Sequence, residues 1–129
     1  MGRQKLSGNS PWERVVGYSR AVRAGQHVWI SGTTATDDAG QIVAPGDAAG
    51  QARQALRNVR AALELAGAGL EHVVRTRIYV TRMGDRDAIA RVHAEFFREV
   101  RPAATMVEVS RLVDPEMLVE IEAEAFVDA

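Results

Sequence analysis

The sequence predicts an α+β domain in which two helices cover one face of a sheet, with the elements in the order βββαβαββ. Two segments carry apolar residues at helical spacing, and short segments rich in β-branched and aromatic residues precede, separate and follow them. In the later strands, apolar residues alternate with charged ones, which makes one face of the sheet apolar and the other charged. We expect the two amphipathic helices to cover the apolar face.

The first strand with a clear signal is Val28 to Gly32, where a β-branched and aromatic run ends in small polar residues. A second short extended piece is expected at Gln41 to Val43, and it is stopped by Pro45 and Gly46. Both segments precede the first helix.

The first helix is expected to begin after Asp47, which stands where an N-cap belongs. Its apolar residues recur at the spacing of one buried stripe, at Ala52, Leu56, Val59, Leu63 and Ala66. Gly67 and Gly69 are expected to end it. The second helix is expected to begin at Gly84 or Asp85 and to stop at Pro102. Its inward residues are predicted to be Ile89, Val92, Phe96 and Val100.

Between the helices, the segment from Val73 to Thr81 alternates as a strand does. Val74, Thr76, Ile78 and Val80 are expected on one side, and Arg75, Arg77 and Tyr79 on the other. Two more strands close the chain, at 105–110 and 117–127, with a turn around Asp114 and Pro115.

Alternation in these strands predicts a sheet face that is mostly ionisable. The residues assigned to it are Arg75, Arg77, Glu108, Glu120, Glu122 and Glu124. The pattern alone leaves two interpretations open. The face is either exposed to solvent and carries weak cross-strand ion pairs, or it is a polar subunit interface or binding site.

Composition limits the classes of function. At 129 residues and 47% hydrophobic, the chain is expected to form a single domain over residues 1–129, with residues 1–11 as a loose N-terminal segment. A net charge of −1 offers no field that attracts nucleic acid or anionic membranes, so neither partner is expected. The absence of cysteine excludes disulfides and thiolate chemistry. Without an apolar run that suits a signal peptide or a membrane span, the expected location is cytoplasmic.

Several segments resemble the reactive-intermediate deaminase family, known as the RidA or YjgF family. The similarity is carried by Arg101 to Val109, Leu118 to Ala123, Ser31-Gly32 and Gln51 to Val59, and it extends from about Tyr18 to Phe126. The resemblance implies a chorismate-mutase-like fold. It also implies a homotrimer whose charged sheet faces are buried against one another, with a small-molecule cleft at each subunit boundary.

The resemblance further implies which residues form the site. Glu120 matches the glutamate that positions or activates the attacking water, and is the predicted catalytic residue. The predicted substrate-binding residues are Tyr18, Ser31, Gly32, Ala104, Thr105 and Met106. No cofactor is expected, and no metal, since the histidines lack the spacing of a metal site.

The chain departs from the family pattern at Ala104, where the deaminases carry the arginine that clamps the substrate carboxylate. A methyl group cannot replace the donors of a guanidinium. Arg82, Arg20 or an arginine of a neighbouring subunit are the candidate substitutes, whereas Arg101 is expected to point the other way. His93, on the inward side of the second helix, is interpreted as a hydrogen-bonded core or interface residue rather than a base.

Three functional hypotheses follow. The first is hydrolysis of an imine, enamine or related electrophile, other than 2-aminoacrylate, that lacks the usual α-carboxylate. The second is a non-catalytic small-molecule binder or accessory protein that uses the same cleft. The third is the ribonuclease or translation-inhibitor activity that some family names suggest, which the charge balance and the lack of a pair of catalytic histidines disfavour.

Overall fold

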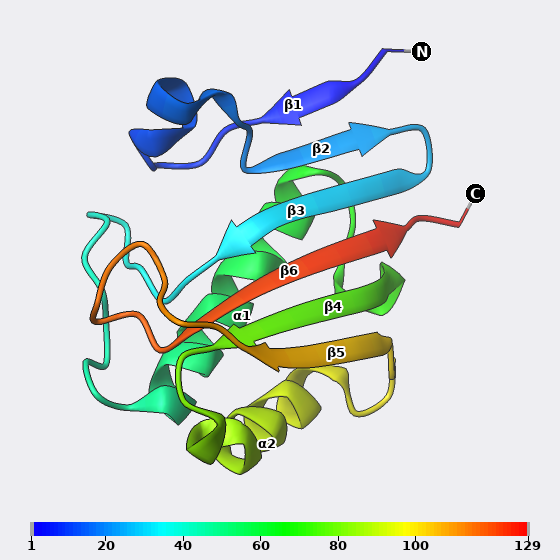
Figure 1. Cartoon of the computed structure of the whole chain (residues 1–129). Helices are drawn as coiled ribbons and strands as arrows, with labels where there is room; N and C mark the ends of the chain where they lie inside the picture. Colours follow the sequence, from blue (N-terminus) through cyan, green and yellow to red (C-terminus); the bar gives the residue numbers. More distant parts are fainter. Residues whose placement is uncertain (1, 129) are drawn as a thin grey trace.

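The computed structural model describes residues 2–128, and its two main helices pack against one face of a six-stranded sheet (Figure 1). The element order βββαβαββ and the coverage of one sheet face are both confirmed. Within residues 2–128, no helix has the length and apolar character needed to cross a membrane. The strands are β1 (Gln4–Leu6), β2 (Ala21–Ala24), β3 (His27–Thr33), β4 (Val73–Val80), β5 (Ala103–Glu108) and β6 (Val119–Phe126). The helices are α1 (Ala48–Leu65) and α2 (Arg86–Phe97), with a π-helix η1 (Glu13–Gly17) and the 3₁₀ turns η2 (Leu70–His72) and η3 (Met83–Asp85).

The last strand of the chain lies inside the sheet, whose order is β1-β2-β3-β6-β4-β5. β6 runs antiparallel to both β3 and β4, while β5 runs parallel to β4. The parallel pair requires a crossover, and α2 supplies it. Because β6 joins the two halves of the sheet, its residues can meet side chains from both.

The strands before α1 differ in place from those expected. Gln41 to Val43 is not a strand, because only an isolated bridge joins Thr36 to Ile42. The Asp37 carboxylate accepts hydrogen bonds from the Ala39 and Gln41 amides, both at 2.9 Å, and so offers this loop an alternative to strand pairing. The other two strands are β1 and β2. Part of the segment expected to be loose therefore lies at the sheet edge.

The first helix begins and ends as its sequence indicates. The Asp47 side chain accepts a hydrogen bond from the Gly50 amide at 3.0 Å, so the expected N-cap is confirmed. Gly67 follows the last turn with φ of 75°, the left-handed conformation that glycine adopts without strain. The stripe between these ends is buried against the sheet, with Leu56, Val59 and Leu63 fully enclosed.

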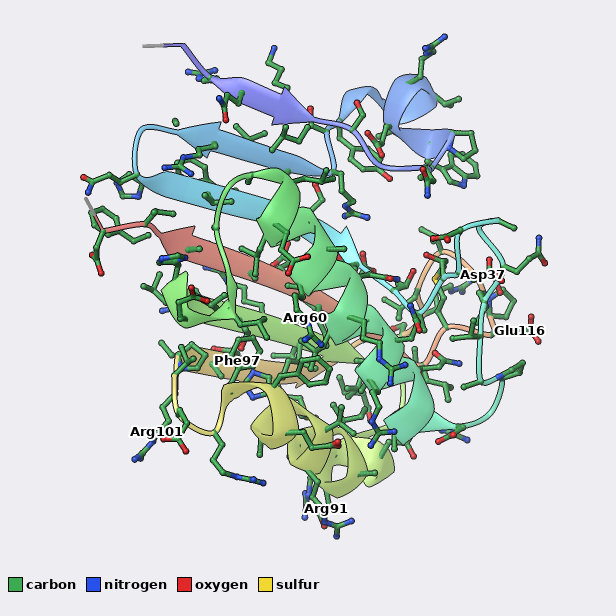
Figure 2. The ribbon with its side chains drawn as sticks, turned by 180° about the vertical axis from the view of Figure 1, so that it is seen from behind. Asp37, Arg60, Arg91, Phe97, Arg101 and Glu116 are labelled. Carbon is green, nitrogen blue, oxygen red and sulfur yellow. The ribbon has the colours of Figure 1, made fainter. Side chains whose placement is uncertain are left out.

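One expected core position, Val74, is wrong, and another, Phe96, packs against the core but is only partly buried. Val74 is 51% exposed, because β4 pairs Val73 with Ala125 and Arg75 with Glu124, which leaves Val74 as the extra residue of a bulge. In α2, Phe97 rather than Phe96 is fully buried. Phe96 lies half-buried beneath the guanidinium of Arg60, 5.2 Å from the ring centre. Figure 2 shows Phe97 between α2 and the sheet.

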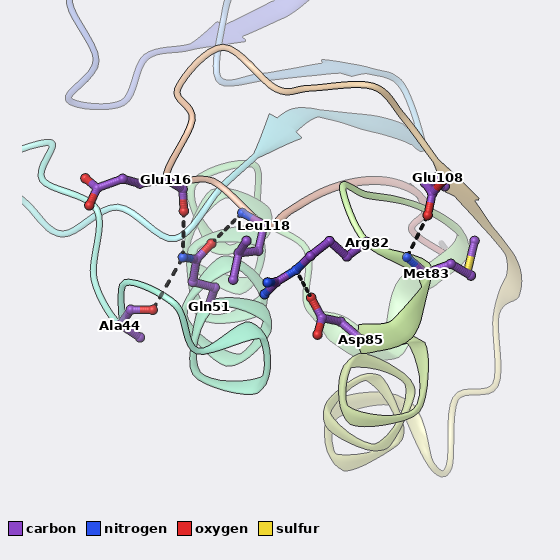
Figure 3. Close-up of polar contacts among 8 residues, drawn as sticks. All are labelled: Ala44, Gln51, Arg82, Met83, Asp85, Glu108, Glu116 and Leu118. Atoms are coloured by element: carbon purple, nitrogen blue, oxygen red, sulfur yellow. Dashed lines mark hydrogen bonds and ion pairs between the residues drawn. The ribbon is translucent and has the colours of Figure 1, made fainter.

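Glu108 was assigned to the charged face, and this too is wrong. It pairs with Val80 on the face that the helices cover, and its carboxylate accepts a hydrogen bond from the Met83 amide at 2.7 Å (Figure 3). The register of β5 therefore places Thr105 and Val107 on the charged face, beside Arg77 and Tyr79. Either face of a parallel edge strand can pack against the core, and the alternation of residues in β5 does not show which face is buried.

The rest of the charged face carries the expected cross-strand contacts. Arg77 pairs with Glu124 at 2.8 Å, and the Tyr79 hydroxyl donates to Glu122 at 2.8 Å. Trp29 also lies on this face, next to Glu124 in the register, and is 43% exposed. The open face is thus a mixture of ion pairs and exposed apolar groups.

Gln51 ties the start of α1 to the segment that leads into β6. Its fully buried side chain donates to the Glu116 carbonyl at 2.9 Å and accepts from the Leu118 amide at 2.8 Å (Figure 3). A weaker bond reaches the Ala44 carbonyl at 3.4 Å. One amide side chain thereby fixes the residues that lead into β6, which begins one residue before Glu120.

We expect Gln51→Leu to lower the free energy of unfolding by about 2 kcal/mol, because it leaves the Leu118 N–H and the Glu116 C=O, both in part-buried hydrogen bonds, without their partner. Urea denaturation followed by circular dichroism measures the change. Gln54→Leu is the matched control, since Gln54 is only partly buried and bonds one neighbour, Asn58, within the helix. If Gln51→Leu lowers the free energy of unfolding no more than Gln54→Leu does, the structural role of the Gln51 amide is contradicted.

Candidate functional site

Glu120 lies on β6 where that strand passes a bulge in β3. Ile30 lies opposite Ala123, and Thr33 lies opposite Ile121. Between these pairs β3 has two residues, Ser31 and Gly32, where β6 has one, so β3 contains a bulge. The Glu120 carboxylate packs directly onto the α-carbon of Gly32. A β-carbon at position 32 would overlap Glu120 Oε2 and lie only 2.9 Å from Cδ. Glycine is therefore required here for the close approach of the carboxylate.

The loop before β2 is fixed to the same bulge. The Ser31 hydroxyl donates to the Ser19 carbonyl at 2.6 Å, and the Ser31 amide donates to the Arg20 carbonyl at 3.1 Å. These bonds bring the neighbouring Tyr18 alongside, with 36% of its surface exposed. Of the predicted site residues, the structure therefore brings Tyr18, Ser31, Gly32 and Glu120 together. We call this group, together with Arg20 and Glu13, the Glu120 cluster.

Arg20 is the cation of the Glu120 cluster. Its Nη2 donates to the Gly32 carbonyl at 2.7 Å. Burial lowers the pKa of this guanidinium, and the nearby charges of Tyr18, Glu13 and Glu120 oppose that shift. An arginine remains protonated despite such a shift. The sequence suggested Arg20 only as a possible substitute for the arginine absent at Ala104, and gave no sign that it contacts Gly32.

Glu13 is a member of the cluster that the sequence analysis missed. It is only 8% exposed, and its Oε2 accepts a hydrogen bond from the Gly8 amide at 2.8 Å. Glu13 Oε1 and Arg20 Nε are enclosed side-chain atoms without a hydrogen-bond partner among residues 2–128. A glutamate in a polar, irregular segment carries no periodic signal, so only the folded arrangement reveals it.

Glu120 is a half-buried carboxylate. Burial raises the pKa of the Glu120 carboxyl, and the charge of Glu122 raises it further, whereas Arg20 lowers it. A carboxyl group whose pKa is raised toward neutrality is better suited to accept a proton at physiological pH than an ordinary glutamate.

The predicted residues of β5 lie elsewhere in the chain. Glu120 pairs with Tyr79 and Tyr79 with Val107, whereas Ala104 pairs with Thr76 on the opposite face of the sheet. From strand spacings of about 4.8 Å and a rise of about 3.3 Å per residue, the Cα atoms of Glu120 and Ala104 are about 14 Å apart. One chain therefore does not bring these two residues together.

Within β5, the three predicted residues diverge. Ala104 and Met106 face the helices, and Met106 packs against the core, whereas Thr105 is exposed on the charged face. Beside Ala104, the buried Thr76 hydroxyl bonds His93 Nε2 at 2.9 Å, and burial lowers the pKa of that histidine. His93 is thus the hydrogen-bonded, partly buried residue that the sequence suggested.

Arg82, the other candidate arginine of this chain, does not lie beside Ala104. Arg82 follows the far end of β4 and pairs with Asp85 at 3.2 Å (Figure 3). Arg101 is exposed in the turn before β5, with φ of 54°. For metal binding, residues 2–128 contain no group of three histidine, aspartate or glutamate side chains arranged to hold an ion.

Comparisons with known proteins agree with this geometry. A model of the family described as endoribonuclease L-PSP matches residues 9–127. A RutC family protein from Pyrococcus horikoshii is 40% identical over 84% of this chain and 86% of its own. The 3-aminoacrylate deaminase RutC from Acinetobacter baylyi is 38% identical over 85% of this chain and 86% of its own.

Solved structures show the same fold. A member of the YjgF/YER057c/UK114 family from Mycobacterium tuberculosis is 48% identical, with a TM-score of 0.88 over 98% of this chain and all of its own. The structure of E. coli TdcF with bound serine is 29% identical, with a TM-score of 0.81 over 96% of this chain and 94% of its own.

We expect Glu120→Gln to be at least as stable as the wild type at pH 7. Because the folded-state pKa is raised above the ordinary 4.5, the folded chain binds more protons than the unfolded chain in the window between the two values. The contribution of Glu120 to stability is therefore present below pH 4.5 and is lost as pH rises through the folded pKa. Urea denaturation from pH 4 to 8 should show that the free energy of unfolding falls less in the variant than in the wild type as pH rises.

The matched control is Glu122→Gln, which removes the acceptor of the Tyr79 hydroxyl on the same strand. A glutamine at position 120 that destabilises the fold more than one at position 122 would show that ionised Glu120 makes a stabilising contact, and would contradict this account.

Proposed function

The chain belongs to the endoribonuclease L-PSP family, also named the YjgF, RutC or RidA family, and on that basis we propose that it hydrolyses an imine, enamine or related electrophile. The single observation that carries the proposal is the half-buried Glu120 carboxylate, which packs against Gly32 and has a raised pKa. The name of the Acinetobacter baylyi relative, a 3-aminoacrylate deaminase, supports this class of reaction.

In this proposal Glu120 accepts a proton from water while the oxygen attacks the carbon of a C=N bond. Glu120 returns this proton to nitrogen, which completes a carbinolamine. The carbinolamine loses ammonia when its hydroxyl proton is transferred to nitrogen, and a carbonyl product remains. One water is consumed and one ammonia is released, so no oxidant or cofactor is needed. A carboxylate with a raised pKa suits both proton transfers, because it is a stronger base than an ordinary glutamate and can return the proton that it takes up.

The substrate is proposed to lack a carboxylate at the position where the family's deaminases bind one. Ala104 has no hydrogen-bond donor in its side chain, and Met106 beside it is apolar. Without an arginine to clamp the substrate, the negative charge of Glu120 would also repel an anionic substrate. We therefore propose that 2-aminoacrylate is not a substrate, and that the ligand is uncharged or larger.

The cleft is proposed to be completed by other copies of the chain in a homotrimer. Glu120 and Ala104 lie on opposite faces of one chain, so a pocket lined by both requires a second subunit. The open sheet face, with Trp29 at 43% and Val107 at 40% exposure, is suited to burial against such copies. Tyr18, Ser31, Gly32 and Glu120 would come from one subunit, and Ala104 to Met106 from its neighbour.

A non-catalytic binder or accessory protein is the second candidate. The observation that favours it is Ala104 itself. Without an anchoring donor, a substrate is aligned less well for reaction, whereas the cavity can still hold a ligand. RNA cleavage, which the family's description suggests, has less support. His72 accepts a hydrogen bond from the Gly69 amide at 3.0 Å and His93 bonds Thr76, so both are held in structural contacts.

We expect the protein to be a homotrimer in solution. The ionisable groups of the charged sheet face need either water or partners, and packing against other copies supplies partners while it also covers the exposed apolar residues. Size exclusion with light scattering should give about three times the chain mass of 14.0 kDa. A stable monomer would remove the proposed subunit boundary and the cleft with it.

The enzymatic proposal is tested with two imines that differ only in a carboxylate. A flavin amine oxidase generates the imine of phenylacetaldehyde from 2-phenylethylamine, and an amino-acid oxidase generates the imine of phenylpyruvate from phenylalanine. We expect the protein to accelerate ammonia release from the first and not from the second. It should also leave unchanged the formation of pyruvate from enzymatically generated 2-aminoacrylate.

Glu120→Gln should abolish the acceleration while the mass and melting temperature are kept. Thermal-shift screening with the carbonyl products measures binding separately. Binding without any acceleration would favour the accessory-protein candidate, and acceleration of pyruvate formation would show that another arginine holds the carboxylate.

A further inference from the structure

The Glu120 cluster contains three charged side chains around one peptide unit. Glu120 packs on the α-carbon of Gly32, and Arg20 donates to the carbonyl of Gly32 at 2.7 Å. Glu13 lies near Arg20, since a β-carbon at Gly8 would contact both side chains, and its charge acts on the guanidinium. Two carboxyl groups therefore act on one buried arginine, and one of them is the proposed catalytic base.

We propose that Arg20 is a positioning residue that holds Glu120 oriented and ionised, and that Glu13, fixed by the Gly8 amide, holds Arg20 in turn. The catalytic consequence rests on the proposed function of Glu120 as the base. The arrangement of the three side chains does not depend on it.

The direction in which the guanidinium points carries the first step. Arg20 Nε is enclosed, and Nη2 is bonded to the Gly32 carbonyl, so the Nε–Nη2 edge faces the protein. This edge is one of the two that bind a carboxylate with paired hydrogen bonds. Arg20 is thus committed to internal contacts and acts on Glu120 through position and charge, rather than as a free clamp for a substrate.

The second step concerns the charges that face Glu120. Glu122, next on the same strand face, disfavours ionisation of Glu120, and Tyr79 from β4 offers no cation. Arg20 is the cation that acts on Glu120 from the β2 side, and it opposes both burial and Glu122. Removing it leaves the carboxyl with only those groups that favour its protonated form.

The third step connects the N-terminal segment to the site. The Gly8 amide donates to Glu13 Oε2 at 2.8 Å, and a β-carbon at position 8 would lie 3.2 Å from that oxygen and 3.3 Å from Arg20 Cδ. Residues 8–13 therefore pack closely on the arginine. Glu13 competes with Glu120 for the same positive charge, so neutralising Glu13 should strengthen the effect of Arg20 on Glu120.

The test measures the pKa of Glu120 directly, by carbon-13 NMR of labelled glutamate carboxyls, with the signal assigned by its loss in Glu120→Gln. We expect Arg20→Met to raise the pKa of Glu120 further, Arg20→Lys to change it less, and Glu13→Gln to lower it. Arg14→Met is the matched control, because it removes the same charge from an exposed position on η1. It should leave the Glu120 signal almost unmoved.

These opposite signs separate the proposal from a general loss of structure, which would move the Glu120 pKa toward its ordinary value in every variant. If Arg20→Met does not fold, Glu13→Gln and Arg20→Lys still decide the question. An unchanged Glu120 pKa in folded Arg20→Met, or a shift no larger than in Arg14→Met, would overturn the proposal.

Where turnover is found, Arg20→Met should move the acid limb of the kcat profile to higher pH, and Arg20→Lys should restore much of it. An acid limb that stays in place would contradict the catalytic consequence. The NMR titration needs no substrate. A failure of the proposed hydrolase function would therefore leave the positioning role of Arg20 separately testable.

Discussion

The close approach of Glu120 to Gly32 is the constraint on which the site depends. It requires a residue without a β-carbon at the bulge in β3, and it requires β6 to lie between β3 and β4. Gln51 fixes the start of β6 through buried hydrogen bonds to Glu116 and Leu118, so the first turn of α1 helps to set the position of the carboxylate. The two helices cover one face of the sheet, and the other remains open for ion pairs and for contact with further copies.

The same constraint separates the two groups of predicted site residues. The carboxylate sits near the junction of β2, β3 and β6, whereas Ala104 and Met106 belong to the edge strand β5 and face the helices. A sheet strand cannot turn both its odd and its even residues toward one ligand. The distribution of the candidate site over two surfaces is therefore a consequence of the strand register, and it is the physical reason for proposing that neighbouring chains share one cleft.

Sequence reasoning recovers the features that depend on local rules. Asp47 caps α1, Gly67 follows its last turn, and the alternation of β6 places Glu120, Glu122 and Glu124 on one face. Prediction from sequence fails where the pairing of strands or the packing of distant segments determines the position of a residue. The bulge at Val74 and the parallel pairing of Glu108 with Val80 leave no local signal, and Glu13 and Arg20 come together only once the segment at Gly8 packs on both side chains. The resemblance at Glu120 and Ala104 identified the family without showing which surfaces these residues occupy.

The central claim is that the Glu120 cluster of one chain faces the Ala104 to Met106 segment of another. A crystal structure of the assembled protein near neutral pH tests it most directly. The account predicts a cavity at each subunit boundary, with Glu120 and Gly32 on one wall and Ala104 and Met106 of the adjacent copy on the other. An assembly in which these two surfaces face solvent, or face away from one another, would contradict it.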